Sequence, residues 1–106
     1  MPLAGGWTGL RILMDGRSIS LDREQAGSLA GPLDGVLTAA RGSAPLTSPV
    51  LVRIEILRDG EVLGLLELAA PDIRWTPVGS TALTGRPTPA GLQALRDGLD
   101  RLAGQR

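Results

Sequence analysis

Residues 50–68 read VLVRIEILRDGEVLGLLEL, and this segment has the strongest structural pattern in the chain. Apolar residues alternate with polar ones before the pair Asp59-Gly60, and apolar residues dominate after it. An Asp-Gly pair supplies the two positive φ angles of a type I′ turn, whose twist matches that of the strands it joins. The segment therefore predicts a β-hairpin with a two-residue turn.

Two further segments predict strands. Residues 10–21, LRILMDGRSISL, place an Asp-Gly pair at positions 15 and 16 between alternating apolar residues, which predicts another hairpin. Residues 73–76, IRWT, follow an Ala-Pro-Asp bend and are rich in residue types that favour strands. We therefore expect five strands in total.

Two segments predict helices. Residues 22–40 carry apolar residues at three- and four-residue steps, with Asp22 as N-cap and Gln25 in capping-box spacing. Gly31-Pro32 interrupts this segment, so we expect a kink or two short helices there. Residues 89–103 follow Thr88 as N-cap, begin with a proline and place their leucines on one side.

The 106 residues are expected to form one domain, 1–106, with loops near residues 42–49 and 77–87. The predicted order of elements is ββα-βββα. Sheets and helices with one apolar side bury that side against each other. We therefore expect an α+β fold of two layers, with a mainly antiparallel sheet built from the two Asp-Gly hairpins and the short strand. Both helices would pack on one face of it.

The second hairpin predicts an unusual outer face. Unbroken pairing from the Asp59-Gly60 turn directs one set of side chains towards the helices, namely Val50, Val52, Ile54, Ile56, Leu63 and Leu65. The other face then carries Leu51, Leu57, Val62, Leu66 and Leu68. A contiguous apolar patch on a solvent face usually marks an interface. We expect a partner to bind there, with Trp75 as an anchor. The alternative is that the chain covers this face itself, with the arm around Trp7 or the 77–87 loop.

The residue inventory excludes most catalytic chemistries. The chain has no Cys and no His, and all of its basic residues are Arg. Thiolate nucleophiles, the usual general base near neutral pH and Schiff-base chemistry are therefore absent. Lys, Asn, Phe and Tyr, which share A/T-rich codons, are all missing, a pattern typical of a GC-rich bacterium. We expect no enzyme activity, no metal and no cofactor.

Glu67 is the carboxylate with the least usual predicted position. Unbroken pairing places it opposite Val52 on the side that faces the helices, where a carboxylate would be an acid–base candidate. The alternative, which we favour, is that Glu67 lies at a strand end and reaches solvent, because lone buried carboxylates are rare.

Charge and targeting signals narrow the possible partners. The 11 Arg residues balance 11 acidic residues and are interspersed with them, so no basic stripe favours nucleic acid. The first residues lack the basic and apolar regions of a signal peptide, and the longest apolar run is too short to span a bilayer. We therefore expect a cytoplasmic protein that binds neither nucleic acid nor membrane.

These observations favour a non-catalytic protein–protein interaction module: an adaptor, a chaperone or an assembly subunit that self-associates through the second hairpin. The partner would be another protein or a second copy of the chain. The alternative is a domain that binds a small ligand or anion with the 77–87 loop, using Arg74 and Arg86 as cationic partners.

Overall fold

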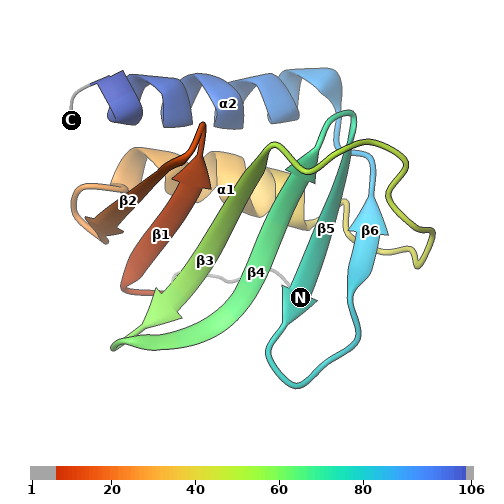
Figure 1. Cartoon of the computed structure of the whole chain (residues 1–106), viewed down its shortest axis with the longest axis horizontal. Coiled ribbons are helices and arrows are strands. Elements are labelled where there is room, and N and C mark those ends of the chain that lie inside the picture. Colours follow the sequence, from red (N-terminus) through yellow and green to blue (C-terminus); the bar gives the residue numbers. More distant parts are fainter. Residues whose placement is uncertain (1–6, 105–106) are drawn as a thin grey trace.

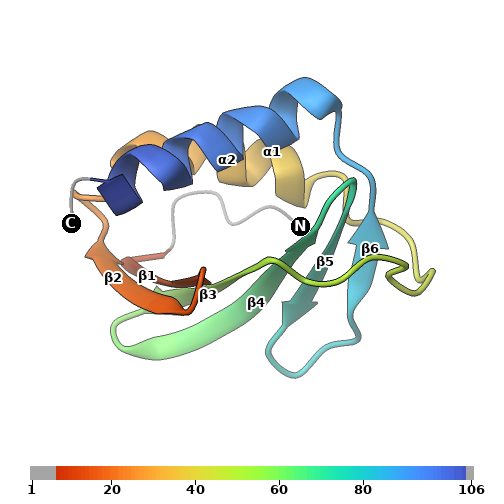
Figure 2. The ribbon, with the colours of Figure 1, turned by 45° about the horizontal axis from the view of Figure 1, so that its top comes forward.

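The computed structural model describes residues 7–104, which form an antiparallel sheet of six strands with two helices packed together on one face (Figures 1 and 2). This confirms the predicted α+β fold, with the order ββα-ββββα. The strands are β1 (Gly9–Met14), β2 (Arg17–Asp22), β3 (Val52–Arg58), β4 (Glu61–Ala69), β5 (Asp72–Pro77) and β6 (Leu83–Gly85). The helices are α1 (Ala30–Leu37), preceded by a 3₁₀ turn over Gly27–Leu29, and α2 (Pro89–Gly104).

The sheet has the strand order β2-β1-β3-β4-β5-β6, with every neighbouring pair antiparallel. The two long hairpins therefore lie next to each other, because β1 pairs with β3. β2 and β6 form the two edges of the sheet.

Both hairpin turns have the predicted backbone. Asp15 and Gly16 have φ angles of 53° and 74°, and Asp59 and Gly60 have φ angles of 51° and 85°. The first hairpin also has the expected register throughout, with Leu10 opposite Leu21 and its inward side chains buried.

The second hairpin contains a β-bulge that the turn and the apolar pattern did not predict. Leu57 lies opposite Val62, as the turn dictates, but Ile56 lies opposite Gly64, so β4 has one extra residue at this point. A shift of one residue moves each later side chain to the other face. Leu66 and Leu68 consequently point towards the helices, where they are 0% and 1% exposed. Their predicted place on the outer face is wrong.

Gly64 explains why the bulge lies where it does. A Cβ atom on Gly64 would lie 2.3 Å from the Trp75 ring and 2.9 Å from the carbonyl oxygen of Thr76. Only a residue without a side chain can occupy this position beneath the ring. The bulge brings Gly64 to the inner face, and Trp75 then fills the space above it.

The short strand β6 lies in the segment predicted to be a loop. The chain that follows α1 binds it, since the amides of Arg41 and Gly42 donate to the Thr84 carbonyl and the Thr84 amide donates to the Gly42 carbonyl. The Thr84 hydroxyl donates to the Ala44 carbonyl at 2.7 Å. The segments around residues 42–44 and 83–85 therefore hold each other in place.

The helices begin as their capping residues dictate. The Thr88 hydroxyl accepts a hydrogen bond from the Gly91 amide at 3.1 Å, and α2 starts at Pro89, as predicted. Asp22 and Gln25 exchange the two hydrogen bonds of a capping box, at 2.7 and 3.0 Å, but the segment that follows is a turn. The helical structure begins only at Gly27, and Pro32 occupies the first turn of α1.

The core lies between the sheet and the helices. It includes both tryptophans, and the guanidinium of Arg23 lies 4.0 Å from the centre of the Trp7 ring. Trp7 is therefore part of the core, together with Leu95 and Leu99 of α2. The predicted N-terminal arm includes Met1–Gly6, which lie outside the described residues.

Candidate functional site

Both helices lie on one face of the sheet, and the described residues place no helix on the opposite face (Figure 2). We call it the open face. Its side chains alternate with the buried ones along each strand. They are Arg11 and Leu13 of β1, Ser18 and Ser20 of β2, Arg53, Glu55 and Leu57 of β3, Val62, Leu65 and Glu67 of β4, and Arg74 and Thr76 of β5.

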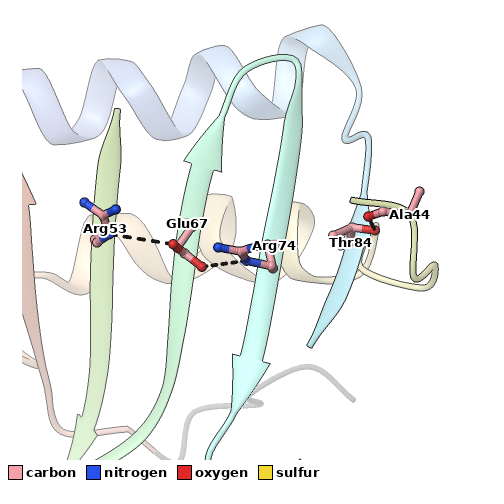
Figure 3. A network of polar contacts seen from close by, with 5 residues as sticks. All are labelled: Ala44, Arg53, Glu67, Arg74 and Thr84. Atoms are coloured by element: carbon pink, nitrogen blue, oxygen red, sulfur yellow. Dashed lines mark hydrogen bonds and ion pairs between the residues drawn. The ribbon is translucent and has the colours of Figure 1, made fainter. Parts of the chain in front are cut away.

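A row of ion pairs crosses the middle of the open face. Glu67 lies between Arg53 and Arg74, with oxygen–nitrogen distances of 3.6 and 2.7 Å (Figure 3). The Nε–H of Arg74 donates a hydrogen bond to Glu67, which raises the pKa of the Arg74 guanidinium. The Glu67 side chain is only 7% exposed, because its two neighbours cover it. The row therefore pairs its one carboxylate with two arginines and keeps a net charge of +1.

Glu67 differs from both sequence-based expectations. It lies on the open face two residues before the end of β4 and is almost buried, whereas we expected either the core side or a strand end that reaches solvent. The bulge at Gly64 causes this difference, since it reverses the facing of every later residue in the strand. Two arginines bind the carboxylate, so it serves as a cross-strand link between β3, β4 and β5.

Apolar side chains on the open face stand between charged ones. Leu13 and Val62 are 39% and 37% exposed, and Leu57 and Leu65 are half-buried. Arg11 and Glu55 form a third ion pair of this face, at 3.0 Å. Leu51, directly before β3, is 57% exposed and lines a hollow of about 380 Å³ together with Leu13 and Arg53. The surface is thus a mixture of leucines and paired charges.

The predicted partner-binding residues fall into two groups. Leu51, Leu57 and Val62 lie on the outside, but Leu66, Leu68 and Trp75 belong to the core and are at most 5% exposed. Leu65 takes their place on the open face, where Leu13 of β1 also lies. The sequence signal for this exchange was Gly64, because a glycine inside a strand often marks a bulge.

The predicted ligand residues Arg74 and Arg86 bind different carboxylates. Arg74 binds Glu67 on the open face, whereas Arg86 donates from Nε to Asp72 at 2.9 Å, beyond the end of β6. This bond raises the pKa of the Arg86 guanidinium. Part of the 77–87 segment forms β6, so its residues belong to the sheet edge and to its connection with α2.

A second hollow lies beside α2, near Arg86. It has a volume of about 580 Å³ and lies between the β4–β5 turn, the connection from β6 to α2 and the first turns of α2. Arg96 of α2 lines it, and the buried Nε of this side chain has no hydrogen-bond partner among the described residues. The sequence pattern did not point to Arg96, because its surroundings come from three separate segments.

Within residues 7–104, no helix combines the length and the apolar composition needed to cross a bilayer. The described part of the chain also brings no three acidic side chains together as a set of metal ligands.

Comparison of the chain with protein-family models, curated proteins and solved structures gave no match.

Proposed function

We propose that this chain is a non-catalytic protein–protein interaction module that self-associates through the open face of its sheet. The observation that carries the proposal is the exposure of three apolar side chains, Leu13, Leu51 and Val62, on the outward side of the sheet. Apolar side chains grouped on one exposed surface favour association. An adaptor, a chaperone and an assembly subunit each act by binding alone, so this function needs no catalytic residue.

The charges of the open face favour a second copy as the occupant. Three arginines and two glutamates are interspersed there, and all five take part in ion pairs at or below 3.6 Å. The five charges sum to only +1 and are paired within the face, so the face needs no strongly charged partner. A surface that pairs with itself about a twofold axis must be self-complementary. The chain also has a formal net charge of zero, so two copies do not repel each other.

The size of the open face sets the expected strength. Six strands about 4.8 Å apart and about six residues long cover a flat area of about 24 by 20 Å. A stable interface takes about 800 Å² of accessible surface from each partner. The flat area of the open face is smaller than about 800 Å², although side chains that project from the sheet add accessible surface to it. We therefore expect a dimer that dissociates on dilution in the micromolar range.

Sedimentation velocity tests the proposal, with two variants chosen to preserve the fold. Leu65→Arg places an arginine opposite Glu55, and Leu13→Asp places a carboxylate opposite Arg53. Both changes add a favourable cross-strand pair while placing a charge in the middle of the proposed interface. Ala94→Arg, on the exposed side of α2, is the matched control, because it adds a charge on the other layer of the molecule.

The wild type and Ala94→Arg are expected to shift from monomer to dimer between about 1 µM and about 1 mM, and the two open-face variants are expected to stay monomeric. A wild type that remains monomeric over this range would contradict the proposal. Equal association of the wild type and Leu65→Arg would contradict it too, since the contact would then lie elsewhere.

A further inference from the structure

The hollow beside α2 has the size and the walls of a small-molecule site. Its volume of about 580 Å³ falls within the range of about 300–1,000 Å³ that is usual for ligand pockets. Its apolar wall consists of Pro71, Pro87, Pro89 and Leu92. Proline rings fix the backbone around them, so this wall is formed before any ligand binds. A preformed wall lowers the entropy that a ligand loses on binding.

Arg96 gives this hollow its polar end. The side chain is half-buried, and its Nε is a buried donor without a hydrogen-bond partner among the described residues. Buried donors in folded proteins are nearly always bonded, because leaving one unsatisfied costs free energy. The natural counterpart of an unsatisfied guanidinium N–H is an anionic oxygen.

The nearby acidic groups do not fill this role. Asp100 follows Arg96 by one helical turn and lines the same hollow, but the described residues contain no ion pair between the two side chains. Asp72 binds Arg86, which also lines the hollow and still has further N–H groups to donate. Two arginines therefore line a space in which Asp100 is the one acidic lining residue within the described part of the chain.

We infer that this hollow binds a small organic anion, a carboxylate with an apolar body, whose charged end meets Arg96 and whose body lies against the three prolines and Leu92. Such a ligand would give the Arg96 guanidinium an anionic partner and cover the apolar wall at once. This site is separate from the open face, so ligand binding and self-association can succeed or fail independently.

Nuclear magnetic resonance of the arginine side chains tests this inference. The Nε–H signal of Arg96 is assigned from its loss in Arg96→Gln and is then followed while 2-naphthoate is added. The neutral amide 2-naphthamide has the same apolar body without the charge, and acetate has the charge without the body. Arg101→Gln is the matched control, since Arg101 is exposed on the same helix and does not line the hollow.

We expect 2-naphthoate to shift the Arg96 Nε–H signal in a saturable manner and to bind at least about tenfold more tightly than either control compound. Arg96→Gln should weaken binding by at least about tenfold, Arg96→Lys should weaken it less because it keeps the charge, and Arg101→Gln should leave it unchanged. Thermal unfolding of each variant checks that the fold is retained.

Three results would overturn the inference: no saturable binding of 2-naphthoate, equal binding of 2-naphthamide, or unchanged binding by Arg96→Gln. The comparison of the three compounds uses the wild-type protein alone, so it tests the inference even if a variant does not fold.

Discussion

Replacing Leu66 by alanine should destabilise the protein strongly, because the bulge in β4 places this side chain in the core. Leu66 is 0% exposed and lies between Ile54 of β3 and Trp75 of β5. The change removes three buried carbon atoms, at about 0.8 kcal/mol each, and leaves a cavity that adds to the loss. We expect the free energy of unfolding to fall by about 3 kcal/mol, and the melting temperature by about 12 °C.

Chemical denaturation followed by tryptophan fluorescence measures this effect. Trp7 and Trp75 are both buried, so unfolding exposes both rings and shifts their emission. Leu65→Ala is the matched control, since the neighbouring leucine is half-buried on the open face. It should lower the free energy of unfolding by less than about 1 kcal/mol.

The two leucines exchange roles if the hairpin pairs without a bulge, since every residue after Gly64 then faces the other way. A larger loss of stability for Leu65→Ala than for Leu66→Ala would therefore refute this register of β4.

Three other substitutions test separate features. Gly64→Ala should destabilise the protein by about 1–3 kcal/mol, because its Cβ would overlap the Trp75 ring. Gly35→Ala in α1, with open space around it, should stabilise the protein by about 0.5–1 kcal/mol. Urea denaturation measures both variants, and a change of stability in the same direction for both would contradict this packing. Thr88→Ala should lower the free energy of unfolding by about 1 kcal/mol, because α2 loses its N-cap. An unchanged melting temperature of this variant would show that the cap is not needed. Arg74→Gln should lower the free energy of unfolding by about 1 kcal/mol, because the 2.7 Å bond to Glu67 is lost. Equal stability of this variant and the wild type at low salt would argue against that pairing.

Local sequence signals predicted the turns and the C-terminal helix. Asp-Gly at positions 15–16 and 59–60 adopts the backbone that such pairs favour, and Thr88-Pro89 starts α2. Each of these features depends on the residues at the site itself. They can therefore be predicted without knowing which segments pack together.

The direction in which the side chains of β4 point depended on a contact outside the second hairpin. Gly64 must lie beneath Trp75, and nothing in residues 50–68 reveals where that ring is. As a result, Leu66 and Leu68 were assigned to the wrong face, and the true open-face residue Leu65 was assigned to the core. A glycine within a run of apolar residues was the one local sign of a bulge.

The sixth strand and the hollow beside α2 also arise from distant segments. β6 has three residues, too few for a periodic pattern, and it forms because β5 and the chain after α1 both pair with it. Arg96 reads as one more polar residue on an amphipathic helix. Its importance follows from the prolines of two other segments, which the fold brings beside it.

The claim that two copies meet at the open face can be tested residue by residue with amide chemical shifts recorded over a dilution series. We predict that shifts change with concentration at the outward residues of β1, β3 and β4, such as Leu13, Arg53 and Leu65, and stay constant along α2. Shifts that do not depend on concentration, or that change mainly on the helices, would contradict self-association through this face.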